Sequence, residues 1–335
     1  MRPLRSFVVV AATTSLLAAC ADRDPSTLVA PKNAPTSLSL SVAAGEDVAF
    51  SPFLEQLDFA QKASGGMRNI SLADAQISVK AGVPGWEGTT TLVSNRTHRF
   101  GSEFVARDPR RGGGADITYL IDRSDAVALN FVPPSTVTVI PASVIEPEID
   151  ASMRRWQDQP ACGGVAVTKV ADPGTDPDLI DGLAYADPTR IGTPYADITH
   201  AGWLPASFFN AIEPHGADFI LGVTFTFIFT DDDDNPTDID HDGRLDVAFR
   251  EIYYNRSFPW TTNALDNNNV DIQSVVTHES GHAFGLAHFG KIMQDKDGFL
   301  KYAPRAVMTA AYVSAFRDLT GTDNSSFCQI WSSSK

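Results

Sequence analysis

The sequence has 335 residues, of which 43% are hydrophobic and 10% aromatic, enough to bury a sizeable core in one main domain with an extension. The formal net charge of -15 and the isoelectric point near 4.7 argue against nucleic acid as a partner, because phosphate backbones attract basic surfaces. Such an acidic surface suits an exported protein, which we expect to be a monomer, and it is compatible with calcium binding.

The N-terminus has the pattern of a targeting segment. Arg2 and Arg5 precede an apolar run over residues 7–19, which is too short and too interrupted by hydroxyl side chains to span a bilayer. The run ends in L-A-A-C at Cys20, which resembles the lipobox of bacterial lipoproteins. The resemblance implies that residues 1–20 are a lipoprotein signal peptide. Cleavage would leave Cys20 lipidated and the exported protein membrane-anchored in the cell envelope, at the outer membrane where there is one. The alternative is an ordinary secretory signal cut nearby, which gives an extracellular protein.

The segment after Cys20 carries weaker signals. Residues 21–37 contain prolines among small polar side chains, which predicts a flexible tether. Residues 38–114 predict an N-terminal extension, either a small accessory unit or a propeptide that is removed. Within it, residues 53–62 have the spacing of a short helix, and Ile77 alternates with Val79 as in a strand.

The main domain is predicted over residues 115–335. Arg110 and Arg111, followed by three glycines, mark either a linker or processing point before it or a solvated loop. Apolar spacing then predicts strands that alternate with helices. In chain order, these elements are a strand at 117–121, a helix at 146–157, strands at 165–170 and 197–200, and a short helix at 204–212.

Residues 219–229 have the strongest strand pattern in the chain. Bulky apolar side chains fall on one face and mostly threonines on the other. The apolar face holds Val223, Phe225, Phe227 and Phe229, and the other holds Thr224, Thr226 and Ile228. A second alternating run, residues 247–253, predicts another strand.

An acidic loop lies between these two strands. Its D-x-D-x-D-G pattern spaces carboxylates as in calcium loops, and Gly243 supplies the sharp turn. Counted from Asp238, the twelfth position of the loop, where an EF-hand has glutamate, is Phe249, so the loop is not an EF-hand. The candidate calcium ligands are Asp238, Asp240, Asp242 and Asp246, and the alternative is a solvated loop without an ion.

The most informative stretch is T-H-E-S-G-H-A-F-G-L-A-H, which ends at His288. On a helix, His278 and His282 are four residues apart, so both imidazoles lie on one face and can share a metal ion. Gly285 suits the end of this helix, because glycine accepts the left-handed conformation that reverses the chain. The reversal would bring His288 to the same ion. The alternative is a helix with incidental histidines.

Three neutral imidazoles suit zinc and leave its fourth position open, as in catalytic sites. Glu279 lies about 100° round the helix from His278, beside the ion without competing for it. Zinc lowers the pKa of water to roughly 7, and Glu279 can then accept the proton as a general base.

The histidine motif resembles that of the metzincin metalloproteases and, within them, the matrixins. V-M-T-A-A-Y over residues 307–312 resembles their methionine turn, with Met308 beneath the metal and Tyr312 in a wall of the substrate pocket. Ala310 replaces the usual proline, which leaves the pocket shape open. Residues 317–331 resemble the closing helix of the family. The resemblance therefore implies an α/β (α+β) catalytic domain with a mixed twisted sheet, an active-site helix and a C-terminal helix.

The resemblance also implies a zinc-dependent endopeptidase that acts on protein or peptide substrates. Residues 219–229 would form an edge strand to which an extended peptide adds as another strand; a fully buried strand is the alternative. A surface binding or adhesion lipoprotein that keeps the fold without proteolysis is a second functional hypothesis, and a zinc hydrolase acting on non-peptide amides is a third. A binding scaffold would have no need of Glu279.

The cysteines number three, an odd count for an exported protein. If Cys20 carries lipid, Cys162 and Cys328 remain, and we expect them to form a disulfide. The alternative is that P-A-C-G around Cys162, which faintly resembles the matrixin cysteine switch, supplies a thiolate to the zinc ion. The sequence gives no role to His200, His215 or His241 and leaves a second, structural zinc open.

Overall fold

A computed structural model describes residues 52–63, 69–80, 100–126, 128–132, 136–159, 162–184, 187, 189–294 and 300–332. The predicted signal peptide with Cys20 and the predicted tether lie outside these residues. Within the described residues, no helix combines the length and the apolarity needed to cross a membrane.

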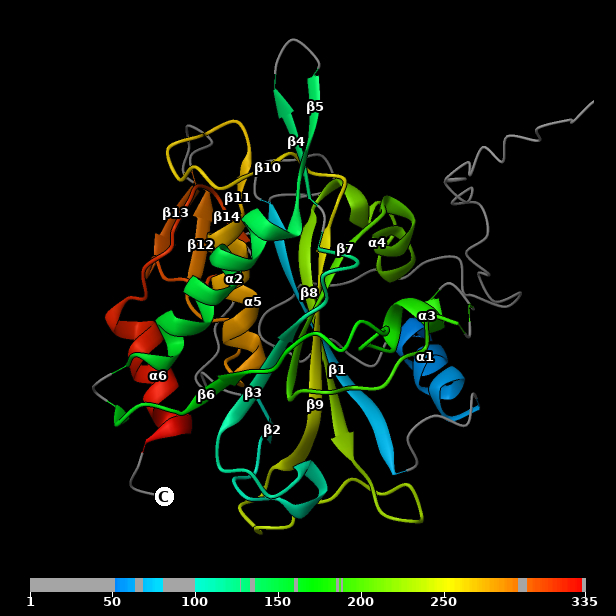
Figure 1. Cartoon of the computed structure of the whole chain (residues 1–335). Coiled ribbons are helices and arrows are strands. Elements are labelled where there is room, and N and C mark those ends of the chain that lie inside the picture. Colours follow the sequence, from blue (N-terminus) through cyan, green and yellow to red (C-terminus); the bar gives the residue numbers. More distant parts are fainter. Residues whose placement is uncertain are drawn as a thin grey trace, which may run out of the picture.

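A mixed sheet forms the centre of the fold (Figure 1). In spatial order its strands are β14 (Ala311–Tyr312), β1 (Ile70–Lys80), β8 (Ile220–Phe229), β9 (Leu245–Asn255), β7 (Ile198–Leu204), β3 (Ile117–Ile121) and β6 (Val167–Lys169), and β2 (Ser102–Glu103) pairs with β9. The pairs β1–β8 and β8–β9 are antiparallel, and the other pairs in this sheet are parallel. The fold class is therefore mixed α/β, as predicted.

Helices cover both faces of the sheet (Figure 1). On one face lie α2 (Ala142–Gln157), α5 (Ile272–Ala283) and α6 (Gly321–Trp331), which share one hydrophobic cluster with the sheet. On the other face lie α1 (Pro52–Ala63), α3 (Ile180–Ala184) and α4 (Ala206–Ile212), which belong to a second cluster. The sheet thus separates two cores, and α5 carries the histidines on the first side.

Shorter elements complete the described part of the chain. Two short helices of 3₁₀ type are Pro109–Arg111 and Gly216–Asp218. Three two-stranded sheets pair β4 (Ala128–Val132) with β5 (Thr136–Ile140), β10 (Trp260–Thr261) with β11 (Val270–Asp271), and β12 (Lys291–Gln294) with β13 (Leu300–Ala303).

Strand β8 has the two faces that its sequence predicts. Phe225 and Phe227 enter the cluster shared with α1, α3 and α4, whereas the Thr224 and Thr226 hydroxyls lie on the opposite face and make hydrogen bonds there. The prediction of an edge strand is wrong, however, because β8 lies between β1 and β9. Alternation reports the two faces of a strand, but not whether a neighbour occupies each of its edges.

The helix predicted at residues 146–157 begins earlier, at Ala142. Pro147 lies inside it, where its ring removes one backbone hydrogen bond. The helix continues through this position because Ile145 and Ile149, on either side of the proline, are both fully buried in the core. Packing therefore outweighs the proline as a boundary signal.

Candidate metal centre

Helix α5 is held at its start and buried along its whole length. Asp271 caps it by accepting a hydrogen bond from the Ser274 backbone N–H (2.9 Å), and Arg317 forms an ion pair with Asp271. On the packed side, the Trp156 indole N–H donates to the Thr277 carbonyl (2.9 Å). The helix that carries His278, Glu279 and His282 is therefore fixed in position.

Gly281 lets this helix approach its neighbours closely. A Cβ atom at this position would lie 2.3 Å from the Met308 sulfur and 2.7 Å from a ring carbon of Trp156. Real Cβ atoms do not approach other atoms so closely, so a larger residue would move the helix away from Met308. The motif alone did not identify this packing role.

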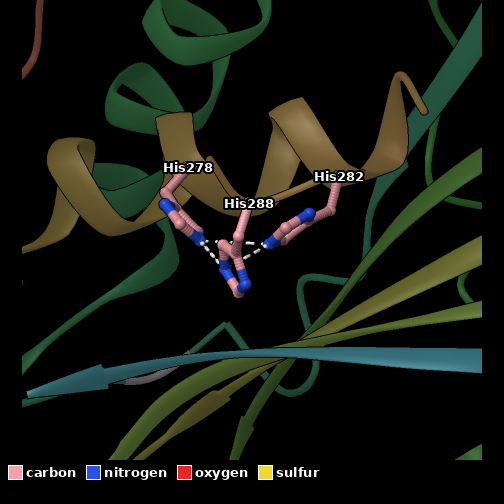
Figure 2. A group of neighbouring side chains, drawn as sticks. All are labelled: His278, His282 and His288. Atoms are coloured by element: carbon pink, nitrogen blue, oxygen red, sulfur yellow. Dashed lines mark hydrogen bonds between the residues drawn. The ribbon is translucent and has the colours of Figure 1, made fainter. Parts of the chain in front are cut away.

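The chain reverses at Gly285, as predicted. Its φ of +94° lies in the left-handed region, and the Leu286 N–H donates to the Gly281 carbonyl (3.0 Å). The reversal brings His288 beside His278 and His282 (Figure 2). We call these three residues the histidine centre.

In the histidine centre, the three Nε2 atoms face one another (Figure 2). They lie 3.0 Å apart for His278 and His288, 3.0 Å for His282 and His288, and 3.1 Å for His278 and His282. Burial lowers the pKa of His278 to about 4 and the pKa values of His282 and His288 well below their usual range. The imidazoles are therefore neutral, which is the form that binds metal ions.

The outer nitrogens fix which ring atom holds the proton. His278 Nδ1 lies 2.6 Å from the Val307 carbonyl oxygen, and His282 Nδ1 lies 2.8 Å from that of Leu286. A carbonyl can only accept, so both Nδ1 atoms are protonated and both Nε2 atoms present lone pairs. These two buried Nε2 atoms lie 3.1 Å apart, so their lone pairs repel each other, and a cation bound by both would remove the repulsion.

The arrangement fits a zinc ion. Nitrogens bound to one ion at about 2.0–2.1 Å in a tetrahedron lie about 3.3 Å from one another, close to the distances found here. Carbonyl acceptors on the outer nitrogens are the usual second layer around metal-binding histidines. The donor set, the proton positions and the spacing therefore agree with the zinc ligation expected from the motif.

Glu279 lies on the same helix and is fully buried. Its Oε1 accepts a hydrogen bond from the Ser78 hydroxyl (2.5 Å), and its Oε2 accepts one from the Thr224 hydroxyl (2.7 Å). Burial raises the pKa of Glu279 to about 7, although these two hydrogen bonds favour the charged form. Gly222 allows the approach, because a Cβ there would lie 2.8 Å from Oε1.

Met308 is fully buried and packs against the histidine-bearing helix at Gly281. The turn around it is held by Asp323, whose carboxylate accepts hydrogen bonds from the backbone N–H groups of Val307 and Met308 (3.1 Å each). Asp323 also forms a capping box with Thr320 at the start of α6. Our reading of the sequence missed Asp323, although T-x-x-D before a helix could have indicated it.

Tyr312 lies in strand β14 and lines a pocket together with Ser78, His278 and Thr309. Its hydroxyl accepts a hydrogen bond from the Asp271 backbone N–H (3.0 Å). The residue predicted to form a pocket wall therefore borders a pocket that reaches the histidine centre. The same pocket includes Ser78, which the sequence did not connect with the site.

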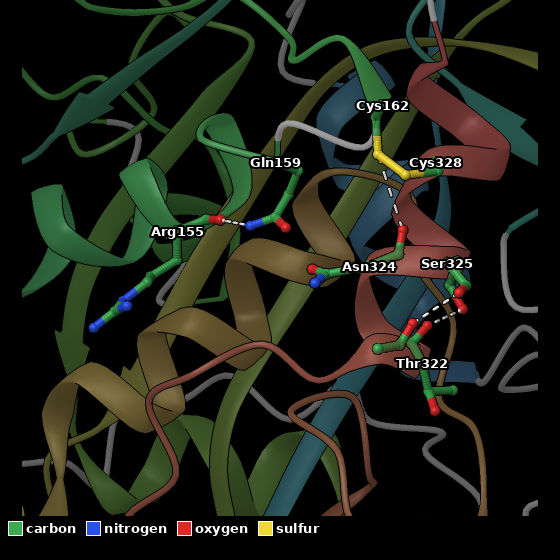
Figure 3. Close-up of a disulfide and its surroundings, with 9 residues drawn as sticks. Arg155, Gln159, Cys162, Thr322, Asn324, Ser325 and Cys328 are labelled. Atoms are coloured by element: carbon green, nitrogen blue, oxygen red, sulfur yellow. Dashed lines mark hydrogen bonds between the residues drawn. A yellow bond between two sulfur atoms is a disulfide. The ribbon is translucent and has the colours of Figure 1, made fainter.

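A disulfide joins Cys162, after α2, to Cys328 on α6 (Figure 3). The bond leaves Cys162 without a free thiolate for a metal ion, so the cysteine-switch alternative does not describe this structure. It connects the helix that packs on α5 with the helix whose first turn holds the Met308 loop.

The acidic loop, residues 238–246, does not gather its four predicted ligands into one group. Asp238, Asp240 and Asp246 each place an oxygen within 4.8 Å of the others, whereas Asp242 groups with Asp240 and Glu103. Asp246 is buried and bonds the side chains of Arg110 (2.6 Å) and Thr237 (2.6 Å). Calcium binding by this loop stays a prediction.

A buried acidic cluster appears where the sequence indicated nothing. Asp176, Asp178 and Asp181 place one oxygen each within 4.8 Å of the others, and Glu251 on β9 lies beside them, sharing the Tyr253 hydroxyl with Asp178. Arg190 forms an ion pair with Asp181. The three aspartates are close together in the sequence, but Glu251 joins them only through the position of β9 in the sheet.

The histidines without a predicted role stay outside these groups. His200 is buried with Nδ1 2.9 Å from the Tyr254 hydroxyl, whereas His215 is exposed. Among the described residues, the clusters able to hold a metal ion contain neither of them, nor His241.

The chain matches no family model and no curated protein. Its function must therefore be inferred from the site itself.

Proposed function

We propose that the protein is a zinc-dependent metalloendopeptidase with a matrixin-like catalytic domain. The observation that carries the proposal is the set of three imidazoles whose Nε2 atoms meet within 3.1 Å, next to a buried glutamate on the helix that carries two of them. The methionine turn below this helix and the strand-helix-strand order of β3, α2 and β6 support the same family resemblance.

In this function His278, His282 and His288 would hold the ion. Zinc supplies Lewis acidity, which polarises a peptide carbonyl and lowers the pKa of water. Glu279 accepts the proton of the attacking water and passes it to the leaving amine.

Other residues fix the geometry of the reaction. The carbonyls of Val307 and Leu286 hold the ligand rings in the required tautomer. The pocket lined by His278, Thr309 and Tyr312 is placed to receive a side chain of the substrate next to the bond that is cut. Export, lipid attachment at Cys20 and calcium in the acidic loop belong to the same proposal and depend on sequence alone.

The test combines metal content with cleavage. The chain from residue 21 should bind one zinc ion, and a library of diverse peptides should be cut with the ion present and not after chelation. His282→Ala should lose both zinc and cleavage. His215→Ala, which changes an exposed histidine, is the matched control and should keep both.

Stoichiometric zinc without cleavage of any peptide, even when the cleft is accessible, would contradict the peptidase. That result would favour the binding or adhesion lipoprotein, which keeps the fold and the metal but performs no reaction.

A further inference from the structure

Strand β1 lies in the groove that an extended peptide would need. It pairs antiparallel with β8 and parallel with β14 and passes beneath the three histidines (Figure 2, blue strand). Extended peptides bind enzymes and receptors by adding to a free strand edge, where their backbone completes the sheet. The edge of β8 nearest Glu279 is already filled by residues of the same chain.

The pairing is continuous up to the site. Gln76 pairs with Thr224, Ser78 with Gly222, and Val79 with Ala311 on the other side. The Val79 N–H also donates to the Ala310 carbonyl (3.2 Å). Both backbone edges that border the site are therefore satisfied by β1.

Ser78 is the residue of β1 that reaches the reacting groups. The β1–β8 register shifts between Ser78 and Val79, and such irregularities redirect side chains. The Ser78 hydroxyl donates to Glu279 (2.5 Å), and Ser78 also lines the pocket beside His278. With a protein donor on Oε1 and the Thr224 hydroxyl on Oε2, Glu279 has both oxygens engaged.

The opposite face of β1 packs against the second hydrophobic cluster, which it shares with α1, α3 and α4. Leu72 and Ala75 are buried in the cluster with α3 and α4, and Ile77 packs against that cluster. The Leu72 N–H donates to the Asp58 carboxylate of α1 (2.9 Å). The strand is thus held by its apolar side while its polar side meets the site.

We propose that β1 is an internal inhibitor strand, which occupies the substrate's place between β8 and β14 and uses Ser78 to hold Glu279. The proposal rests on the proposed peptidase function, because it names the regulation of that site. Cleavage is slow while β1 is paired with β8 and β14, and it speeds up when β1 is displaced and peptides gain access. This role also gives a reason why β8 is not an edge strand.

The test weakens the packing of β1 against the second hydrophobic cluster and leaves Glu279 unchanged. Ile77→Asp in the zinc-loaded chain from residue 21 places a charge against the second core. Phe59→Asp is the matched control, because Phe59 in α1 is 75% exposed. Three quantities are compared with the unchanged chain: hydrogen exchange of the amides in residues 70–80, cleavage of a quenched random-octapeptide mixture, and binding of that mixture in a Glu279→Gln background.

We expect Ile77→Asp to speed exchange of residues 70–80 and to raise cleavage and binding by at least about tenfold, because apparent affinity scales with the fraction of open molecules. Phe59→Asp should behave as the unchanged chain. A synthetic peptide of residues 69–80 should inhibit Ile77→Asp, and a scrambled peptide should not. If Ile77→Asp does not fold, the 69–80 peptide is added instead to the unchanged chain after cleavage has begun, and it should slow that cleavage.

Equal cleavage and binding by the unchanged chain and a folded Ile77→Asp would overturn the inhibitor role and leave the peptidase intact. The inhibitor role would also be overturned if the unchanged chain cleaved peptides and the 69–80 peptide had no effect. Binding that rises in Ile77→Asp without any cleavage would instead contradict the peptidase and support displacement of β1.

Discussion

The histidine centre and the acidic loop both gather potential metal ligands, but the protein offers the two sets of ligand atoms different partners. In the histidine centre, carbonyls occupy the outer ring nitrogens of His278 and His282 and leave their bare Nε2 atoms facing each other. In the acidic loop, the carboxylates of Asp238 and Asp246 already accept hydrogen bonds from backbone N–H groups. The first arrangement presents lone pairs that a cation would satisfy, whereas the second is largely satisfied by hydrogen bonds from the protein.

The difference shows that spacing in the sequence is only part of a metal site. A site is preorganised when its ligand atoms are fixed by other atoms and have no donor of their own. Burial adds to this contrast, because His282 is fully buried whereas Asp240 is exposed. A polar group without a partner costs far more free energy of folding in the buried histidine centre than in the exposed acidic loop.

The largest expected effect concerns Glu279. Glu279→Gln should keep stoichiometric zinc, since this side chain is not a ligand, but should lower the cleavage rate by about 10²–10⁴-fold because the general base is lost. Zinc content and rate are measured in the Ile77→Asp chain, in which we expect the cleft to be open. An active Glu279→Gln enzyme would show that the reaction does not use this base.

The disulfide should matter for the histidine centre more than for the acidic loop. Cys162→Ser with Cys328→Ser should lower the free energy of unfolding by about 2–4 kcal/mol, the usual range for a native disulfide. Hydrogen exchange should then increase in α6 and around Met308, since Asp323 links them. The amides of residues 238–246 serve as the internal control. Two free thiols in the unreduced, denatured parent chain would contradict the disulfide.

The buried acidic cluster should make stability depend on pH. Burial raises the pKa of Glu251 to about 8 and that of Asp176 to about 7. Above about pH 6.5 the buried histidines are neutral in both the folded and the unfolded chain, so up to about pH 8 the acidic cluster makes the folded chain bind more protons than the unfolded chain. The free energy of unfolding should therefore fall as the pH rises through this window.

Denaturant unfolding at several pH values measures this slope. Asp176→Asn should flatten it, whereas Asp233→Asn, in an exposed stretch, should leave it unchanged. Stability that rises between about pH 6.5 and pH 8 would show that the cluster is charged and compensated in the folded protein.

Calcium should have the smallest effect. With a dissociation constant of roughly 1 mM, as in extracellular modules, 10 mM calcium would add about 1.4 kcal/mol by binding the folded state alone. The melting temperature should then rise by a few degrees, and Asp240→Ala should abolish the rise. Asp232→Ala, outside the loop, should not. An unchanged melting temperature in the parent chain would favour the solvated loop.

Local features of the fold could be predicted because they depend on residues close in sequence. The histidine spacing, the reversal at Gly285 and the two faces of β8 each follow from helical or strand geometry over a few residues. The pairing of Cys162 with Cys328 followed from the cysteine count once Cys20 was assigned to lipid.

Long-range features could not be predicted in the same way. Ile77 and Val79 indicated a strand, but nothing near them indicates that it pairs with β8, more than a hundred residues later. The contact between Ser78 and Glu279 depends on that pairing, as the buried acidic cluster depends on β9. Such contacts are properties of the assembled sheet rather than of any short stretch.

The contacts of Asp323 have a consequence for the order in which the site matures. This side chain holds the Val307 backbone, and the Val307 carbonyl fixes the proton on His278. Asp323 follows all three histidines in the chain, so the ribosome adds it last. The residue that indirectly fixes the proton on His278 is therefore made after the ligands themselves. During synthesis, the nascent protein should thus pass through a stage with every histidine ligand present and no competent metal site, which delays metal capture until α6 has docked.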